Sequence, residues 1–346
     1  MTETSVELEL DPRVRVEPGA RLGPFARLSD GSLLTVGDNA TCTSRDEGQT
    51  WSRPRRMVRG DGEGLPGTSG VLVHTRAGAL VYVYMDLAGF RWEWDSRQRE
   101  AAPDVHLDVW AIRSLNEGRT WRDRQCIQRG YCGALIDAIE TRSGRIVVPV
   151  QDLVRHPSRH AIRPCTSADQ GKTWAPANVL DLGGHGHHAG TMEPTLTELN
   201  DGRLWMLLRT NLGRFWSTWS DDDGQSWRVL GPSGIDASSA PAHMVRLASG
   251  RLVLVWNRER PTDGSEPFRR GGDDFSDEVV SWHREELSLA LSADDGQTWS
   301  DPVVILRAPG GQPSYPYVFE ARPGELWVST LFGTRVALRL RESDFV

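Results

Sequence analysis

Ser44-Arg-Asp46-Glu-Gly48-Gln-Thr50-Trp51 is the stretch on which the fold prediction depends, because four close copies of it recur along the 346-residue chain. Each copy has a Ser, an Asp or Asn two positions later, then a Gly, a Thr or Ser, and a Trp. The other copies occupy residues 114–121, 167–174, 220–227 and 292–299, so successive copies lie 53 to 72 residues apart. Such repetition predicts an architecture of similar units before any single segment is assigned.

One copy of this turn motif has the residues of a tight turn between two antiparallel strands. The Asp or Asn side chain accepts hydrogen bonds from backbone amides just downstream, and the Gly adopts a positive φ without steric clash. The Thr or Ser and the Trp then begin the next strand, with the indole as a large apolar plug. Each copy is therefore predicted to be a hairpin corner, and the repeating unit has the length of a four-stranded propeller blade.

A second repeat, in which a Gly-containing turn separates two apolar strands, occurs six times. A Gly after Asp or Ser between alternating runs is a hairpin signal. The hairpin glycines are Gly31, Gly78, Gly144, Gly202, Gly250 and Gly324. We therefore predict an all-β fold, a six-bladed β-propeller of four-stranded antiparallel blades that forms one domain over residues 1–346. The sixth blade lacks a turn motif, and the alternating run at residues 6–10 is expected to supply its outer strand and close the ring.

Composition and charge exclude several classes of function. The chain is 38% hydrophobic and 25% charged, which is ordinary for a globular protein, and its net charge of −7 opposes binding to nucleic acid. No run of about 20 apolar residues exists to span a membrane, and the first ten residues lack the features of a secretory signal. A cytoplasmic location is therefore expected, and nothing in the sequence indicates an oligomeric state.

The four cysteines are Cys42, Cys126, Cys132 and Cys165. They show no CxxC spacing and no dense framework, which favours reduced thiols. A pair between Cys126 and Cys132 is the alternative.

Counting from the hairpin glycines places equivalent residues of the six blades at one height on the propeller axis. Nine positions before each Gly stand Leu22, Ser69, Leu135, Glu193, Pro241 and Tyr315. Seven positions after it stand Asp38, Met85, Gln151, Arg209, Asn257 and Leu331. Polar side chains at such positions indicate either structural ion pairs or a converging site. An Arg, a Glu and a Tyr together at the centre favour the site.

Three loops interrupt the repeats. The segments at residues 90–105 and 261–277 are long enough to be functional, with solvated insertions as the alternative; Trp92 and Trp94 in the first could stack on a sugar ring. A loop at residues 183–190 contains His185, His187 and His188 and leads directly into Glu193. We expect His187 and His188 to contact substrate or to move protons, because no Cys or Asp spacing for a metal accompanies them. A plain surface loop is the alternative.

These motifs resemble those of the sialidases (neuraminidases), whose Asp-box repeats have the form of the turn motif. The family places three arginines, a Glu and a Tyr at the centre of a propeller. The segment from Glu193 to Arg209 looks like the family segment in which the catalytic Glu precedes the second arginine, and the interval matches. The segment that begins at Arg284 and runs into the last turn motif is similar to that of the third arginine.

The two ends of the chain carry the rest of the resemblance. Pro313-Ser314-Tyr315 resembles the stretch with the nucleophilic tyrosine, and Arg21 corresponds in position to the first arginine. Leu331 stands where the family has a Glu that braces this first arginine.

The resemblance implies an exo-acting glycoside hydrolase that releases a terminal, carboxylated, sialic-acid-like sugar. Arg21, Arg209 and Arg284 would bind the carboxylate, because planar guanidinium groups make bidentate hydrogen bonds to it. That carboxylate lies on the anomeric carbon, so a neutral Tyr315 avoids the repulsion that a carboxylate nucleophile would meet, and Glu193 takes its proton.

The proton donor and the other substrate contacts have no matching family motif in the sequence. The proton donor to the leaving oxygen is expected to be Asp38, followed by Asp86 and Asp137. Further expected substrate contacts are His187, His188, Gln151 and Asn257; no metal and no cofactor are expected. Two alternatives stay open: a lyase or hydrolase of uronic-acid or rhamnose-containing glycans that uses His187 or His188, and a non-catalytic propeller that binds carbohydrate or protein.

Overall fold

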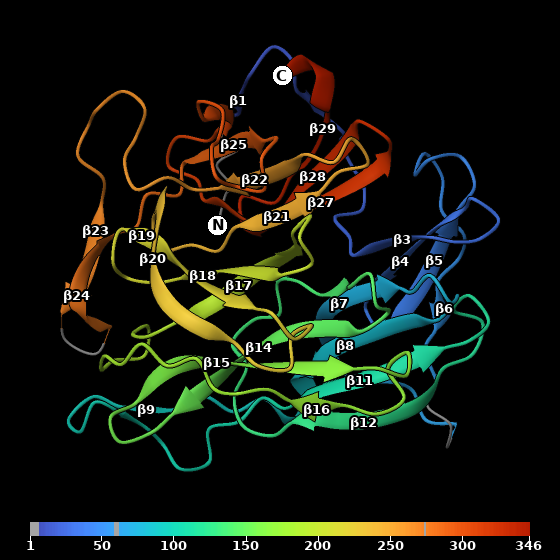
Figure 1. Ribbon diagram of the computed structural model, residues 1–346, viewed down its shortest axis with the longest axis horizontal. Helices are drawn as coiled ribbons and strands as arrows, with labels where there is room; N and C mark the ends of the chain where they lie inside the picture. Colours follow the sequence, from blue (N-terminus) through green and yellow to red (C-terminus); the bar gives the residue numbers. More distant parts are fainter. Residues whose placement is uncertain (1–6, 59–61, 273–274) are drawn as a thin grey trace, which may run out of the picture.

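The computed structural model describes residues 7–58, 62–272 and 275–346, which form a ring of β-sheets (Figure 1). Six sheets follow one another around a central axis in chain order, and each contributes four antiparallel strands to the ring. In the first five blades the innermost strand comes first in the chain and the fourth strand comes last. The prediction of a six-bladed β-propeller is confirmed.

The first three blades have these strands. Blade one contains β3 (Phe25–Arg27), β4 (Leu33–Gly37), β5 (Ala40–Ser44) and β6 (Arg55–Arg56). Blade two contains β7 (Thr68–His74), β8 (Leu80–Asp86), β11 (Val109–Ser114) and β12 (Arg122–Gln128). Blade three contains β13 (Ile139–Glu140), β14 (Ile146–Val154), β15 (Arg159–Ser167) and β16 (Ala175–Pro176).

The other three blades continue around the ring. Blade four contains β17 (Met192–Glu198), β18 (Leu204–Arg209), β19 (Arg214–Ser220) and β20 (Arg228–Asp236). Blade five contains β21 (His243–Arg246), β22 (Leu252–Trp256), β25 (Glu286–Ser292) and β26 (Val303–Arg307), with β1 (Glu9–Leu10) added outside. Blade six contains β27 (Pro313–Arg322), β28 (Glu325–Gly333), β29 (Ala337–Arg341) and β2 (Arg15–Val16).

Short elements lie outside the blades. Blade two carries a hairpin of β9 (Trp94–Asp95) and β10 (Glu100–Ala101), and blade five carries one of β23 (Arg269–Gly272) and β24 (Ser276–Ser281). The helical turns are η1 (Leu87–Gly89) and η2 (Glu342–Asp344). Within the described ranges, no helix has the length and apolar character needed to cross a membrane, and all four cysteines are free thiols.

Each of the five turn motifs joins the third strand of a blade to its fourth. In the first motif the Ser44 hydroxyl accepts a hydrogen bond from the Gly48 amide (2.9 Å), and the Asp46 carboxylate accepts one from the Thr50 amide (2.8 Å). Both bonds recur in the other four copies at 2.7–2.9 Å. The turn is left-handed at Gly48 (φ +80°) and also at the preceding Glu47 (φ +56°).

The N-terminal segment closes the ring, but the residues differ from those predicted. β2 completes blade six by pairing with β29, whereas β1, from the run at residues 6–10, pairs with β26 of blade five. A turn closed by the Val14 amide and the Asp11 carbonyl (2.9 Å) carries the chain from one blade to the next. This short segment therefore belongs to two blades; residue 6 of the predicted run lies outside the described residues.

The buried apolar residues form six clusters, and each cluster fills the seam between two neighbouring blades. This arrangement follows from the alternation of the strands, because both faces of every blade pack against another blade. The seam between blades six and one has the smallest buried set, Phe25, Leu33, Ala321 and Trp327. The polar residues of the axis lie inside this apolar ring and are held in place by it.

Candidate active site

Glu193 and Arg209 are joined by adjacent strands of blade four. Glu193 follows Met192 at the start of β17, Arg209 ends β18, and Met192 is the strand partner of Arg209. The two side chains are 6% and 2% exposed, and Arg209 Nη1 lies 2.5 Å from Glu193 Oε2. A buried carboxylate and guanidinium at this distance form a charge-assisted hydrogen bond.

Tyr315 reaches the same pair from β27 of blade six. Its hydroxyl donates to Glu193 Oε1 (2.7 Å), and Arg209 Nη1 donates to the Tyr315 oxygen (3.4 Å). Glu193 and Tyr315 both have left-handed backbone conformations, with φ of +43° and +57°. Such conformations are costly for residues with side chains and tend to be retained where a side chain must be aimed at a site.

The charges of this trio determine the protonation state of the phenol. Burial and the neighbouring Glu193 carboxylate raise the pKa of Tyr315, so its hydroxyl is protonated at neutral pH and donates to Glu193. Burial opposes the charge of Arg209, but the Glu193 carboxylate outweighs it and the pKa of Arg209 is raised. A neutral phenol, the carboxylate that accepts its hydrogen bond and a buried guanidinium therefore meet at the axis.

A second guanidinium, that of Arg284, also lies near Tyr315. It is 2% exposed, its carbon Cζ lies 3.9 Å from the ring centre of Trp282 and 5.8 Å from that of Tyr315, and its Nη2 donates to the Ser239 carbonyl (2.5 Å). Burial and the nearby Arg209 lower the pKa of Arg284 to about 10. Arg284 is thus charged at neutral pH, and its charge and that of Arg209 repel each other.

Ser239 links the two arginines and was not singled out from the sequence. Its hydroxyl accepts hydrogen bonds from Arg209 Nε (3.1 Å) and Nη2 (2.9 Å) and donates to Asn211 Oδ1 (2.7 Å). Its position in the sequence could have indicated it, because residues 237–241, Ala-Ser-Ser-Ala-Pro, lead into the innermost strand of blade five. Small polar residues at this point of a blade face the axis.

The structure does not bring Arg21 into this group. Its guanidinium carbon lies 5.5 Å from the ring of Trp51, the Trp of the first turn motif. The expected meeting of three arginines is therefore reduced to Arg209 and Arg284. The half-exposed Phe332 does lie beside Tyr315, with ring centres 5.1 Å apart, and its ring centre is 5.7 Å from the guanidinium carbon of Arg284.

The three candidate acids have different surroundings. Asp38 is exposed in the turn between β4 and β5. This turn lies on the face of the ring where the second strand of each blade ends, and Arg209 lies at the end of the second strand of blade four, β18. Asp86 forms an ion pair with Arg124 (3.1 Å). Asp137 is buried and accepts hydrogen bonds from the Thr195 hydroxyl (2.6 Å) and the Leu196 amide. Of these three, Asp38 is the exposed one, and within the described ranges its carboxyl group makes no hydrogen bond or ion pair.

Gln151 and Asn257 are both buried and hydrogen-bonded within the protein. Gln151 Nε2 lies 3.0 Å from His160 Nδ1, and its Oε1 has no partner among the described residues. Asn257 Nδ2 donates to the carbonyl oxygens of Glu286 (2.8 Å) and Pro313 (3.0 Å). Asn257 therefore ties β25 to the start of β27, two residues before Tyr315.

The histidine loop lies beside Arg209. The His188 carbonyl accepts a hydrogen bond from Asn211 Nδ2 (2.8 Å), and the Nδ1 atoms of His187 and His188 are 2.5 Å apart. Burial and the charge of Arg209 strongly lower the pKa of His188, so its imidazole is neutral. In the described part of the chain, no group of three or more His, Cys, Asp or Glu side chains is arranged to hold a metal ion.

The two long insertions fold as hairpins that meet at this loop. Arg99 beside β10 donates to the His185 carbonyl (3.0 Å) and pairs with Asp277 of β24 (2.6 Å). Trp94 packs edge-on against His187, with ring centres 5.4 Å apart, and Phe275 stacks on His188 at 4.4 Å. Segments that are far apart in sequence thus form one aromatic wall beside the trio of Glu193, Arg209 and Tyr315.

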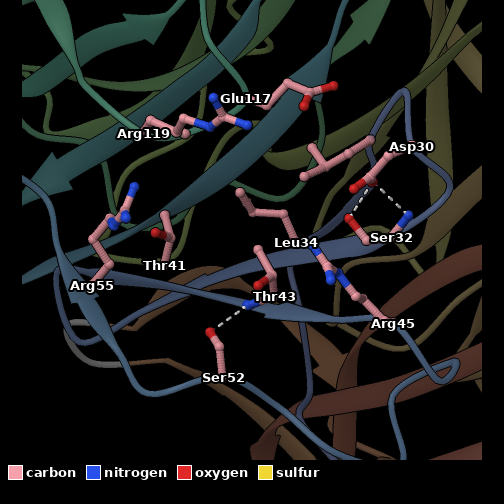
Figure 2. A pocket seen from close by; sticks show the side chains of 12 residues that line it. Asp30, Ser32, Leu34, Thr41, Thr43, Arg45, Ser52, Arg55, Glu117 and Arg119 are labelled. Atoms are coloured by element: carbon pink, nitrogen blue, oxygen red, sulfur yellow. Dashed lines mark hydrogen bonds between the residues drawn. The ribbon is translucent and has the colours of Figure 1, made fainter.

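Cavities also occur away from the axis. Figure 2 shows one of about 310 Å³ at the outer part of blades one and two, beside the turn motifs, with Arg45, Arg55 and Arg119 around its rim. Its floor contains Thr41 and Thr43. None of the predicted site residues lines this cavity.

Comparison with known proteins places this geometry in a wider group. The NanB sialidase of Streptococcus pneumoniae is 13% identical with a TM-score of 0.62, and the match covers 98% of this chain and 70% of that one. The intramolecular trans-sialidase of Ruminococcus gnavus is 13% identical (TM-score 0.55; 94% and 95% covered). The α-L-arabinanase of Penicillium chrysogenum is 14% identical (TM-score 0.60; 96% of each chain).

At these identities the solved structures demonstrate a shared fold, which is common to glycoside hydrolases of several specificities. A search of curated proteins finds no match. The family model for the BNR repeat-like domain matches residues 40–328, which includes every strand from β5 to β27. The chain is therefore a member of the BNR repeat-like domain family.

Proposed function

We propose that this protein is an exo-acting glycoside hydrolase of sialidase type, which releases a terminal carboxylated sugar. The observation that carries the proposal is the hydrogen bond of 2.7 Å from the Tyr315 hydroxyl to Glu193, with Arg209 bound to both residues. A buried phenol bound to a carboxylate has a base for its proton, and the adjacent cation stabilises the negative charge that develops on oxygen.

In the proposed reaction the Tyr315 oxygen attacks the anomeric carbon as the bond to the leaving oxygen breaks. The phenolic proton passes to Glu193, and we assign the proton given to the leaving oxygen to Asp38 because of its open position on the same face. Water then hydrolyses the glycosyl-tyrosine bond, Asp38 takes the proton of that water, and Glu193 returns a proton to Tyr315. The stereochemistry is retained because two displacements occur at one carbon.

The test is Tyr315→Phe, assayed on a panel of terminal sialosides, ketodeoxynonulosonates and uronides. We expect turnover to fall by at least about a thousandfold, because the nucleophile is absent, while carboxylated sugars still bind. Tyr317→Phe is the matched control on the same strand, since the Tyr317 hydroxyl accepts a hydrogen bond from the Phe25 amide (2.9 Å) and is remote from Glu193. Full activity in Tyr315→Phe would falsify the mechanism; binding without any turnover in the unaltered protein would favour a carbohydrate-binding propeller.

A second candidate is a lyase that acts on uronic-acid glycans, and the neutral His188 beside Arg209 favours it. Elimination needs a base for the proton next to the carboxylate and cations that stabilise the resulting charge. This reaction produces an unsaturated sugar that absorbs ultraviolet light, whereas hydrolysis does not. An absorbing product that disappears in His188→Ala identifies the lyase.

A further inference from the structure

Three guanidinium groups surround one indole at the mouth of the site. The Cζ atoms of Arg284, Arg270 and Arg209 lie 3.9, 4.7 and 5.6 Å from the ring centre of Trp282. These arginines come from different parts of the fold: Arg209 ends β18, Arg284 precedes β25, and Arg270 belongs to β23 in the insertion of blade five. Their meeting at one side chain is a property of the tertiary structure and has no counterpart in the repeats.

The acidic groups of the site neutralise only one of these cations. Glu193 pairs with Arg209. Among the described residues, no acidic side chain forms an ion pair with Arg270 or Arg284, and the buried Nε of Arg284 has no acceptor. Tyr315 and His188 are neutral, so the mouth of the site has an excess positive charge that the protein itself does not balance. An excess of this kind beside unused donors is suited to an anionic ligand.

We propose that Arg270 is the third arginine of the substrate site and that, with Arg209 and Arg284, it binds the carboxylate of a sugar acid. This inference rests on the proposed function and gives the site a residue that no repeat or motif indicates. Arg270 is exposed before ligand binds, so its planar donors are free to close on a carboxylate held against Trp282.

The absence of Arg21 from the centre explains why an insertion has this role. Arg21 lies against Trp51 instead of the site, and the apolar ring of Phe332 lies 5.1 Å from that of Tyr315. A carboxylate is therefore favoured beside Trp282, where Arg284 and Arg270 have no acidic partner among the described residues.

The hairpin that carries Arg270 is held against the site by several contacts. The Arg270 guanidinium lies 4.4 Å from the ring centre of Phe275, whose carbonyl accepts a hydrogen bond from the His188 amide (2.9 Å). Gly186 passes so close to this segment that an added Cβ would lie 2.7 Å from the Phe275 carbonyl oxygen. Together with the Arg99–Asp277 pair, these contacts place the base of the Arg270 side chain before a ligand arrives.

The experiment compares Arg270→Ala with Arg270→Lys and with the unaltered protein. Calorimetry measures binding of N-acetylneuraminic acid and of D-glucuronic acid, each beside its uncharged methyl ester. We expect the alanine variant to bind the favoured acid at least about tenfold more weakly, as for loss of a charge-assisted hydrogen bond, with no change for the ester. The lysine variant restores part of the affinity, because it keeps the charge without the planar fork.

Arg269→Ala is the matched control, since Arg269 is the next residue on the same strand and points to Glu259 (3.4 Å). Acid binding in this variant stays at the level of the unaltered protein. Equal losses in Arg269→Ala and Arg270→Ala, or unchanged binding in Arg270→Ala, overturn the assignment. So does an unaltered protein that prefers neither acid over its ester.

This result is separable from the test of the proposed function. If Tyr315→Phe loses turnover while Arg270→Ala binds acids normally, the hydrolase stands and only the role of Arg270 is rejected. If Tyr315→Phe stays active while Arg270→Ala loses acid binding, the carboxylate site stands and the proposed nucleophile is rejected.

Discussion

At the scale of single residues, polar side chains hold both the turn motif and the trio of Glu193, Arg209 and Tyr315 in place by hydrogen bonds. Asp46 accepts hydrogen bonds from Ser44 Oγ (2.8 Å), the Thr50 amide (2.8 Å) and Thr50 Oγ1 (2.5 Å). Asn116 accepts the equivalent amide bond in the second motif and donates its Nδ2 hydrogen to Thr120 Oγ1 (2.9 Å). The acceptor oxygen, rather than the charge, is therefore what all five copies share.

This comparison predicts that Asp46→Asn is tolerated and that Asp46→Ala lowers the Tm. The hydrogen bonds from Thr50 lower the pKa of Asp46 from 3.8 to about 2. A carboxyl group whose pKa is lower in the folded state stabilises the fold fully above pH 4 and loses this contribution as the pH falls towards 2. Thermal unfolding between pH 2 and 7 measures both effects; a Tm for Asp46→Asn as low as that for Asp46→Ala would show that the charge is required.

At the scale of elements, the two inserted hairpins and the histidine loop act as one wall beside the site. The link between them is Arg99, which donates to the His185 carbonyl and to Asp277 Oδ1 while its own carbonyl lies 2.8 Å from His185 Nε2. These groups are partly exposed, so the pair contributes little to the stability of the ring itself. Its effect is to position β23 and β24 beside the axis.

We therefore expect Arg99→Ala to change the free energy of unfolding by less than about 1 kcal/mol and to raise the KM several-fold by loosening the wall. Hydrogen exchange of residues 183–190 and 275–281 should become faster, while the blades exchange as before. Arg97→Ala, an exposed change in the same insertion, serves as the control. Unchanged exchange in both variants would show that the wall does not depend on this link.

At the scale of the whole molecule, a short N-terminal segment closes the ring. Residues 9 to 16 supply a strand to blade five and a strand to blade six, and the turn between them buries Val14 (5% exposed) in the seam of these blades. The next residue, Arg15, is exposed and lies directly opposite Arg339. Like charges at opposed positions of two strands destabilise their pairing.

This arrangement predicts opposite results for the same acidic substitution at adjacent positions. Val14→Asp should lower the free energy of unfolding by about 3 kcal/mol or more, because a carboxylate is placed in an apolar seam. Arg15→Asp should be neutral or slightly stabilising, because it replaces a repulsion with Arg339 by an attraction. Urea unfolding measures both; similar losses would mean that the whole segment, rather than its buried side chain, determines closure.

The repeats were enough to predict the six-bladed ring, and the count from the turn glycines predicted that Glu193, Arg209 and Tyr315 lie together. Glu193, Arg209 and Tyr315 could be placed near one another because hairpin pairing relates each side chain to its turn glycine. A bulge shifts this pairing by one residue at Glu193, so that Met192 lies opposite Arg209. The count also selected Gln151 and Asn257, but it describes position and not partners, and Asn257 proved to bind two carbonyl groups of neighbouring strands.

The position of Arg21, the contacts of the histidine loop and the place of Arg270 beside Trp282 could not be predicted from the repeats and are seen in the folded protein. The physical reason is that residues in long connections have no period to count. Their positions depend instead on the side chains that they contact in the folded protein, such as Trp51 for Arg21, Asn211 for His188 and Trp282 for Arg270.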